Sequence, residues 1–185
     1  MDAVAGPAVV PDTTAPPSEE LQSATVASPL GELLLIASEK GLVEVYLPSS
    51  KGVPATTDVA HDPAAHCLPA AREQLHAYFA GTLQDFDLPL DLVGSPFQLS
   101  VWASLVRIPF GATRSYGDVA RDVGADPATG ARAVGLAAGA NPVATVVPCH
   151  RVIGANGDLV GYAGGLQAKR WLLDHEARVA GTVLF

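Results

Sequence analysis

Cysteine, positive charge and long apolar runs are all scarce in this 185-residue chain. The two cysteines, Cys67 and Cys149, could form at most one disulfide, which excludes the dense disulfide framework of a small secreted protein. No apolar run approaches the ~18 residues that a membrane-spanning helix requires. The N-terminus also lacks the basic segment and unbroken apolar stretch of a signal peptide. We therefore expect a soluble, cytoplasmic protein with reduced thiols and no membrane contact.

Basic residues are few and unevenly placed. The formal net charge is −8 and the isoelectric point about 4.9, which argues against a broad cationic surface for nucleic acid. Residues 1–96, however, hold 3 Lys and Arg against 13 Asp and Glu, while residues 97–185 hold 8 against 6. The acidic excess thus belongs to the first half. If the second half binds nucleic acid, it must do so through a few well-placed arginines and a close surface fit, with moderate salt dependence.

The chain is 49% hydrophobic, enough for one core or for two small lobes that share one. The pattern predicts an α+β protein with a small N-terminal antiparallel-sheet lobe and a mostly helical C-terminal lobe that contains a helix-turn-helix. We place a disordered, proline-containing tail at residues 1–22, the N-terminal α/β lobe at 23–94, the C-terminal lobe at 95–180 and a short tail at 181–185.

Strand-like pieces dominate the N-terminal lobe. Short apolar segments at residues 24–28, 32–38 and 42–47 are separated by turn residues and predict an antiparallel sheet. The polar stretch 51–62 predicts a loop, and helical spacing of apolar residues predicts a helix over 64–79. Alternation over residues 85–92 suggests one further strand.

Two serine caps mark helices in the C-terminal lobe. Ser95 precedes a proline and a glutamine at the spacing of a capping box, and Ser115 with Asp118 repeats this pattern. After a turn predicted at 124–129, residues 130–140 form a second helix whose exposed residues are mostly Ala and Gly, apart from Arg132. A helix with so few long side chains can approach DNA closely without reading its bases, as in a minor groove, so we expect sequence-tolerant binding.

The segment Pro148-Cys149-His150-Arg151-Val152 is unlike the surroundings of an ordinary buried cysteine. It resembles the active-site motif of the O6-alkylguanine-DNA alkyltransferases. Other elements of that family follow in the right order, namely SY and ARAVG in the helix-turn-helix, the NPV step, the GYAGG loop and the helix LQAKRWLLDHE. The resemblance is strong over 95–176 and weaker over 24–94. Cys149 distinguishes the chain from alkyltransferase-like relatives that carry Trp there.

The resemblance implies a catalytic set. Cys149 would be the nucleophile and permanent acceptor of the alkyl group, His150 would draw away its proton through a water, and Glu176 would orient the imidazole. Tyr116 would donate a hydrogen bond to the leaving guanine with help from Lys169. Asn141 would tie the DNA-reading helix to the reactive segment.

The resemblance also implies a DNA contact set and a base pocket. Arg132 would fill the gap left by the flipped nucleotide. The expected DNA contacts are Arg132, Tyr116, Ser115, Ala131, Gly135 and Arg151, and the expected base pocket is formed by Val152, Tyr162 and Ala163 with backbone groups of Cys149. Some relatives carry Ser where this chain has Ala163, which leaves the backbone donor but removes a hydroxyl group.

General chemistry agrees with these roles. Attack on an alkyl carbon needs a thiolate, and an adjacent base raises the reactive fraction of a thiol that is mostly neutral at pH 7. The alkylated guanine must leave the base stack of the duplex before it can react. An arginine side chain can take its place, because it both stacks on neighbouring bases and pairs with phosphate. Lys169 and Glu176 lie seven residues apart, which puts both on one helix face. The thioether product resists water, so each chain would react once.

We expect no cofactor and no metal, because His61, His66, His76 and Cys67 lack the regular spacing of a zinc site. The expected partner is double-stranded DNA carrying alkylated guanine, bound by a monomer.

Two alternative functions remain at this point. A cysteine hydrolase would use Cys149, His150 and Glu176 as a triad and release more than one product per chain. A non-enzymatic helix-turn-helix regulator would prefer one DNA sequence. The glycines of 161–165 fit either a backbone cradle for a ligand or a plain flexible connection.

Overall fold

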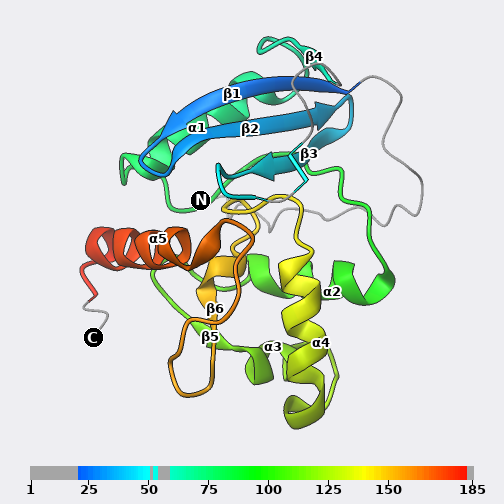
Figure 1. Ribbon diagram of the computed structural model, residues 1–185, viewed down its shortest axis with the longest axis vertical. Helices are drawn as coiled ribbons and strands as arrows, with labels where there is room; N and C mark the ends of the chain where they lie inside the picture. The colour runs from blue at the N-terminus through cyan, green and yellow to red at the C-terminus, as the bar shows by residue number, and fades with distance from the viewer. Residues whose placement is uncertain (1–20, 51, 54–58, 183–185) are drawn as a thin grey trace, which may run out of the picture.

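A computed structural model of the chain describes residues 21–50, 52–53 and 59–182, which form a sheet lobe and a helical lobe (Figure 1). The predicted α+β class is confirmed. The described elements are, in chain order, β1 (Gln22–Ser28), β2 (Gly31–Ser38), β3 (Gly41–Tyr46), β4 (Ala60–His61), α1 (Leu68–Phe79), α2 (Pro96–Val106), β5 (Arg114–Ser115), α3 (Tyr116–Asp122), α4 (Pro127–Gly139), η1 (Cys149–Arg151), β6 (Val152–Ile153) and α5 (Gly165–Ala180).

The N-terminal sheet has the order β3-β2-β1-β4, with α1 packed against it (Figure 1). β1, β2 and β3 pair antiparallel as predicted, but β4 pairs parallel to β1, so the sheet is not purely antiparallel. β4 falls inside the stretch predicted to be a loop. Its two exposed residues carry no apolar alternation, and long-range pairing with β1 creates the strand.

The first helix is shorter than the apolar spacing predicts. α1 begins at Leu68, four residues after the expected start, because residues 63–67 form turns in which His66 takes a φ of 51°. The side chains of Leu68, Ala71 and Leu75 are fully buried. They seal the sheet lobe on the side of α1.

Both predicted capping boxes are present in the helical lobe. The Ser95 hydroxyl accepts from Gln98 N while the Gln98 side chain accepts from Ser95 N, and Ser115 and Asp118 do the same at the start of α3. α2 is joined to α4 by a 2.8 Å hydrogen bond from Trp102 Nε1 to Ala137 O. This bond fixes the position of the helix that would face DNA.

α4 begins three residues earlier than predicted. The turn expected over 124–129 is wrong in its second half, because the Asp126 carboxylate accepts from Ala128 N and Thr129 N and Pro127 occupies the first turn. Asp126 and Pro127 therefore form a second helix-start signal that the analysis of the sequence missed.

The free edge of β3 joins the two lobes. Val45 N donates to Pro142 O at 2.9 Å, and Leu42 bridges Leu90 on the same edge. Residues 85–92 thus contribute one bridge at Leu90 and do not form the predicted strand. Buried side chains of both lobes then belong to one continuous core. The reactive segment after Pro142 is held directly against the sheet lobe.

The predicted tails are only partly testable. β1 begins at Gln22, so the boundary after residue 22 is wrong by at least one residue, while residues 1–20 and 183–185 lie outside the described part. α5 ends at Ala180, with Gly181 in the left-handed conformation at φ 69°. Among the described residues, none of the helices has both the length and the hydropathy needed to cross a bilayer.

Candidate active site

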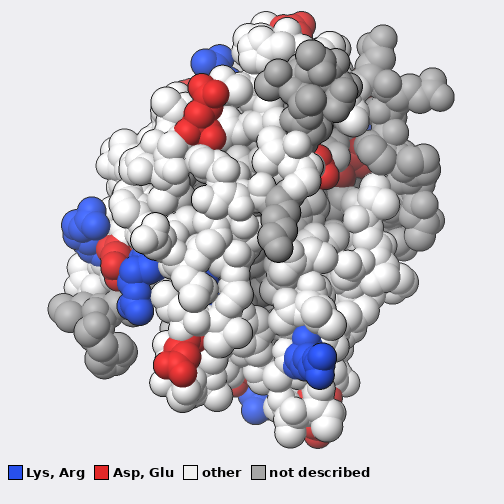
Figure 2. All heavy atoms as spheres, viewed as in Figure 1, with Lys and Arg blue, Asp and Glu red and all other residues white. Residues whose placement is uncertain are grey.

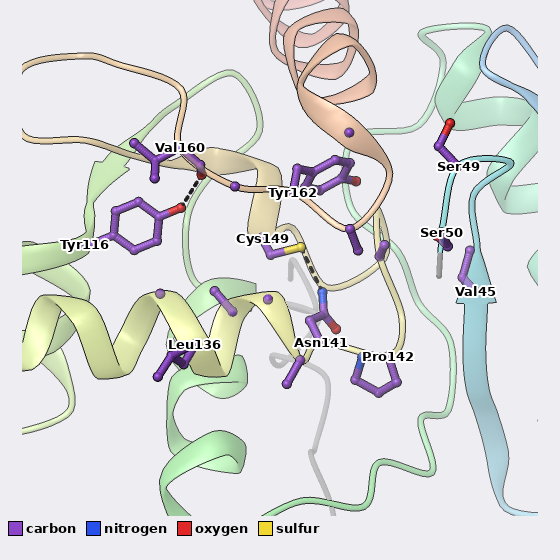
Figure 3. Close-up of a pocket in the computed structure, with 18 of the residues that line it drawn as sticks. Val45, Ser49, Ser50, Tyr116, Leu136, Asn141, Pro142, Cys149, Val160 and Tyr162 are labelled. Carbon is purple, nitrogen blue, oxygen red and sulfur yellow. Dashed lines mark hydrogen bonds between the residues drawn. The ribbon is translucent and has the colours of Figure 1, made fainter. Parts of the chain in front are cut away.

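A cavity of about 950 Å³ opens between α4, the segment around Cys149, the loop before α5 and the end of β3 (Figure 3). Most of the residues expected at the site meet there. The predicted residues that line the cavity are Tyr116, Ala131, Arg132, Gly135, Asn141, Cys149, Tyr162 and Ala163. They come from positions up to 47 residues apart in the sequence, so the fold and not the chain order assembles the site.

Cys149 is the first residue of η1, and its thiol is nearly buried at the cavity wall. Asn141 Nδ2 donates to Cys149 Sγ at 3.2 Å and to Val147 O at 2.8 Å, while Asn141 Oδ1 accepts from Val143 N (Figure 3). Asn141 therefore ties the end of α4 to the sulfur atom. Burial raises the pKa of the Cys149 thiol, with the Asn141 amide and Lys169 acting in the opposite direction. The resting sulfur is a thiol that needs a base.

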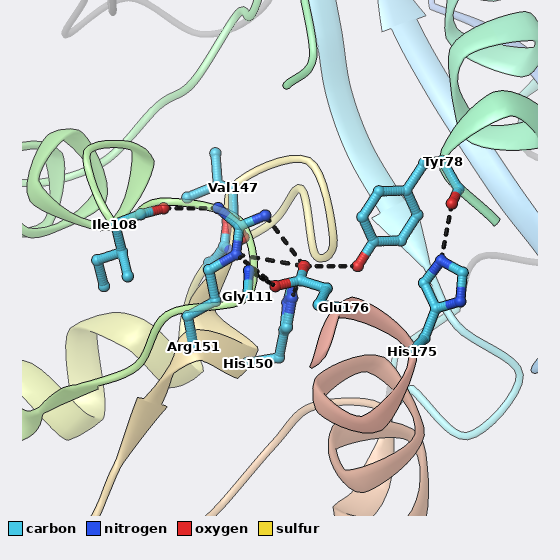
Figure 4. Close-up of polar contacts among 9 residues, drawn as sticks. Tyr78, Ile108, Gly111, Val147, His150, Arg151, His175 and Glu176 are labelled. Carbon is cyan, nitrogen blue, oxygen red and sulfur yellow. Dashed lines mark hydrogen bonds and ion pairs between the residues drawn. The ribbon is translucent and has the colours of Figure 1, made fainter. Parts of the chain in front are cut away.

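His150, which follows Cys149 in the chain, forms a buried pair with Glu176 (Figure 4). His150 Nε2 lies 2.8 Å from Glu176 Oε1, whereas His150 Nδ1 is buried without a hydrogen-bond partner among the described residues. Burial lowers the pKa of His150 although Glu176 opposes this shift. A neutral imidazole that donates from Nε2 to the carboxylate leaves Nδ1 free to accept a proton.

Glu176 is ionised and firmly held. Burial alone would raise the pKa of Glu176, but the hydrogen bonds and charges of His150 and Arg151 outweigh burial and keep the pKa below its ordinary value. The carboxylate also accepts from Tyr78 Oη at 2.7 Å and from Gly111 N at 3.0 Å. Each of its two oxygens thus has more than one donor.

The expected DNA contact by Arg151 does not fit its position. Its side chain is only 4% exposed, its Nε and Nη2 donate to Glu176, and its Nη1 donates to Ile108 O at 2.6 Å. A buried carboxylate needs a compensating cation, and this requirement decides where Arg151 lies. The Glu176 carboxylate, and not a DNA phosphate, is therefore the partner of Arg151 in this structure.

Tyr116 and Lys169 approach each other on one side of the cavity. Lys169 Nζ donates to Val160 O at 3.0 Å and, at 3.4 Å, to Tyr116 Oη, which itself donates to Val160 O at 2.8 Å. Burial lowers the pKa of Lys169 to about 8, and burial followed by the nearby Cys149 raises the pKa of Tyr116. Both groups therefore carry protons near neutral pH. Tyr116 must leave Val160 O before it can donate to a ligand.

α4 presents a largely uncharged face to the cavity. Arg132 is exposed, Gly135 packs beside the Tyr116 ring, and Leu136 is 71% exposed. Figure 2 shows basic atoms over α4 surrounded by mostly uncharged surface. The lone arginine and the small residues agree with the prediction for this helix. The exposed Leu136 was missed, and only its position one turn from Arg132 could have suggested it.

The remaining predicted residues are close to the site but less directly placed. Ser115 uses its hydroxyl group to cap α3, and Val152 is fully buried in β6. Three residues of the N-terminal lobe were not predicted from the sequence: Glu44 and Tyr46 line the cavity, and Tyr78 contacts Glu176. Within the described part of the chain, no group of three or more His, Cys, Asp or Glu side chains is arranged to share a metal ion.

Two family models match this chain. Residues 21–92 match "6-O-methylguanine DNA methyltransferase, ribonuclease-like domain", and residues 96–178 match "6-O-methylguanine DNA methyltransferase, DNA binding domain". The two models meet between residues 92 and 96.

Individual relatives match over most of their lengths. The methylated-DNA–protein-cysteine methyltransferase of Mycolicibacterium paratuberculosis is 51% identical over 154 residues, 83% of this chain and 91% of the relative. A protein of the same name from Methanosarcina acetivorans is 48% identical, covering 80% and 94%. The crystal structure of Mycobacterium tuberculosis OGT in complex with DNA superposes with a TM-score of 0.79 at 47% identity, covering 85% of this chain and 94% of that one.

Proposed function

Because this chain belongs to the 6-O-methylguanine DNA methyltransferase family, we propose that it repairs DNA by moving the alkyl group of O6-alkylguanine onto Cys149. One observation carries this proposal. The nearly buried thiol of Cys149 faces a cavity large enough for a flipped base, with a His150–Glu176 pair behind it. A cysteine of purely structural importance would need neither the cavity nor the pair.

The chemical step is a displacement at the alkyl carbon. The Cys149 proton passes through a bridging water to His150 Nδ1, the buried nitrogen that lacks a partner among the described residues. The resulting thiolate forms a sulfur–carbon bond as the bond from carbon to guanine O6 breaks and its electron pair moves to the guanine. Glu176 stabilises the protonated imidazole that this transfer creates.

Tyr116 and Lys169 serve the leaving guanine. Negative charge develops on the base as the bond to O6 breaks, and a phenol donor stabilises it where water is excluded. Tyr116 turns from Val160 O to the base, and Lys169 keeps the hydroxyl group aligned. The released guanine finally takes up one proton, and His150 gives up the one that it received from Cys149. The reaction therefore neither gains nor loses a proton overall.

Duplex DNA binds along α4. The small residues Ala131 and Gly135 let this helix lie close to the backbone, while Arg132 enters the stack in place of the flipped nucleotide. Leu136, exposed on the same face, adds an apolar contact. Because phosphate contacts are few, binding depends moderately on salt and little on sequence.

The reaction consumes the protein. A thioether lacks the electrophilic carbonyl carbon through which water hydrolyses an acyl thioester, so Cys149 stays alkylated after one event. We place this reaction in the cytoplasm, where the free thiols of Cys67 and Cys149 stay reduced, and assign it to a monomer.

The proposed function is tested on the DNA product. A duplex with one O6-methylguanine is incubated with wild-type protein or with Cys149→Ser, digested to nucleosides and separated by chromatography. The wild type should convert the modified deoxynucleoside to unmodified deoxyguanosine in proportion to the protein added, and the variant should convert none. Cleavage of the strand, or loss of the base, would overturn the proposal.

A further inference from the structure

Tyr78 lies in the N-terminal lobe, yet its hydroxyl group reaches the carboxylate of Glu176, the partner of His150 (Figure 4). Its side chain is fully buried, and its Oη donates to Glu176 Oε1 at 2.7 Å. The two residues are 98 positions apart, and the rest of the Glu176 network comes from the helical lobe. The contact therefore depends on how the two lobes pack together.

We propose that Tyr78 is a positioning residue for alkyl transfer, whose hydroxyl group fixes the Glu176 carboxylate and limits the negative charge that Glu176 offers to His150. This inference rests on the proposed function, since it assumes that His150 accepts the Cys149 proton. It means that a residue of the N-terminal lobe contributes to the reaction.

Oxygen Oε1 of Glu176 is the centre of this arrangement. It accepts from Tyr78 Oη at 2.7 Å, from His150 Nε2 at 2.8 Å and from Arg151 Nη2 at 3.0 Å. Arg151 Nε adds a longer bond of 3.2 Å, and donors from three residues on one oxygen leave the carboxylate little freedom to turn. Since Tyr78 and His150 share this oxygen, loss of the phenol would leave more negative charge to stabilise an imidazolium.

Toward the Glu176 carboxylate, the Tyr78 phenol can act only as a hydrogen-bond donor. Burial, followed by the charge of Glu176, raises the pKa of Tyr78 well above its ordinary value, so that the hydroxyl group keeps its proton. The ring is packed edge-on against Phe79 and Phe110. A phenylalanine at position 78 would keep these contacts and lose only the hydrogen bond.

α5 also contacts Tyr78 through a second, chemically separate bond. His175 Nε2 pairs with Tyr78 O at 2.8 Å, and the His175 ring stacks on Trp171 with centroids 5.0 Å apart. This bond links the same two elements without involving the Glu176 carboxylate. His175→Phe is therefore a matched control that removes one bond between the lobes and keeps an aromatic ring.

Several other groups set the titration of His150. Glu176 and Lys169 act from α5 and Arg151 acts from η1, while the Tyr162 ring lies edge-on to the His150 ring from the loop before α5. Tyr78→Phe leaves all of these side chains in place. A change in the His150 titration would then come through Glu176.

The test measures two quantities in the full-length wild type, Tyr78→Phe and His175→Phe. One is the pKa of His150 by NMR titration, and the other is the single-turnover rate of methyl transfer from duplex DNA. We expect Tyr78→Phe to raise the His150 pKa by about half a unit, because Glu176 Oε1 keeps more of its negative charge. We also expect it to slow transfer about fivefold near pH 7, because the freed carboxylate no longer holds the imidazole in the orientation that accepts the proton, and this loss outweighs the gain in basicity. DNA affinity should stay unchanged, and His175→Phe should change neither quantity.

Two results would overturn the role of Tyr78. Either Tyr78→Phe behaves as wild type in both measurements, or His175→Phe reproduces its effects, which would trace them to lobe packing. If the wild type accepts no methyl group, the proposed function fails instead. The titration, which needs no reaction, still decides in that case whether Tyr78 controls the His150–Glu176 pair.

Discussion

At the scale of single residues, burial and hydrogen bonding have opposite effects on the charges of the groups around Cys149. Burial keeps the resting thiol and the neighbouring imidazole neutral, while two donors from Arg151 and one from Tyr78 keep Glu176 charged. A neutral thiol is protected from adventitious electrophiles until a substrate fills the cavity. The proton can then move to an imidazole whose charge Glu176 stabilises.

Glu176→Gln should slow methyl transfer by about 10- to 100-fold, since a neutral amide stabilises an imidazolium less than a carboxylate does. It should also lower the free energy of unfolding by about 3 kcal/mol, because Arg151 would remain buried without its counter-ion. Single-turnover kinetics measure the transfer rate, and denaturant titration measures the free energy of unfolding. Fluorescence anisotropy measures DNA binding, which should persist. Asp174→Asn, an exposed carboxylate on the same helix, is the control. An unchanged transfer rate would remove Glu176 from the mechanism.

The transfer rate should fall as the pH rises through about 8. Burial lowers the pKa of Lys169 to about 8, so the folded protein loses this charge well below the ordinary lysine value of 10.5. The neutral amine no longer supports Tyr116 as a donor. A pH–rate profile should show this decline in the wild type and a slower, flatter alkaline region in Lys169→Met. The same decline in both proteins would assign it to another group.

At the scale of elements, α4 combines one long side chain with small residues. Arg132 stands beside Ala131 and Gly135 on the cavity face, and Trp102 anchors the other side of the helix to α2. The helix is thereby held rigidly while its exposed face offers little to read a base sequence. This separation of anchoring and contact suits a protein that must inspect any sequence.

Arg132→Ala should therefore slow repair of duplex DNA strongly, by about tenfold or more, because nothing replaces the flipped nucleotide in the stack. Reaction with free O6-methylguanine base should continue at nearly the wild-type rate. Parallel kinetics on the two substrates measure the difference. Arg178→Ala removes the same charge from an exposed position on α5 and should affect neither. Equal losses on both substrates would contradict a flipping role.

Ser95→Ala tests the capping of α2. Removing the hydroxyl group that accepts from Gln98 N should lower the free energy of unfolding by about 1 kcal/mol. The single-turnover rate should not change, since Ser95 does not line the cavity. Ser100→Ala, on the exposed side of the same helix, should cost little or nothing. Similar losses in both variants would show that capping is not the cause.

Across the whole molecule, local signals were predictable and contacts between lobes were not. The capping boxes at Ser95 and Ser115 depend on residues three positions apart, and both were predicted correctly. The motif around Cys149 identified the family, and the cavity contains most of the residues implied by it. Each of these features is encoded in a short stretch of sequence.

The remainder depends on packing between distant segments. Pairing of β4 with β1, the bridge from Leu42 to Leu90 and the bond from Tyr78 to Glu176 each join residues more than 30 positions apart. Arg151 went inward because a buried carboxylate needed a cation, which no local pattern encodes. Function was therefore easier to predict from this sequence than the arrangement that supports it.

The most direct test of the central claim is the intact-protein mass after incubation with a large excess of duplex carrying O6-methylguanine. The account predicts that the wild type gains the mass of one methyl group, that peptide mapping places it on Cys149, and that further DNA adds nothing. Cys149→Ser should gain no mass. A wild-type protein that keeps its original mass while repairing many lesions would contradict the account, because it would be turning over as a hydrolase.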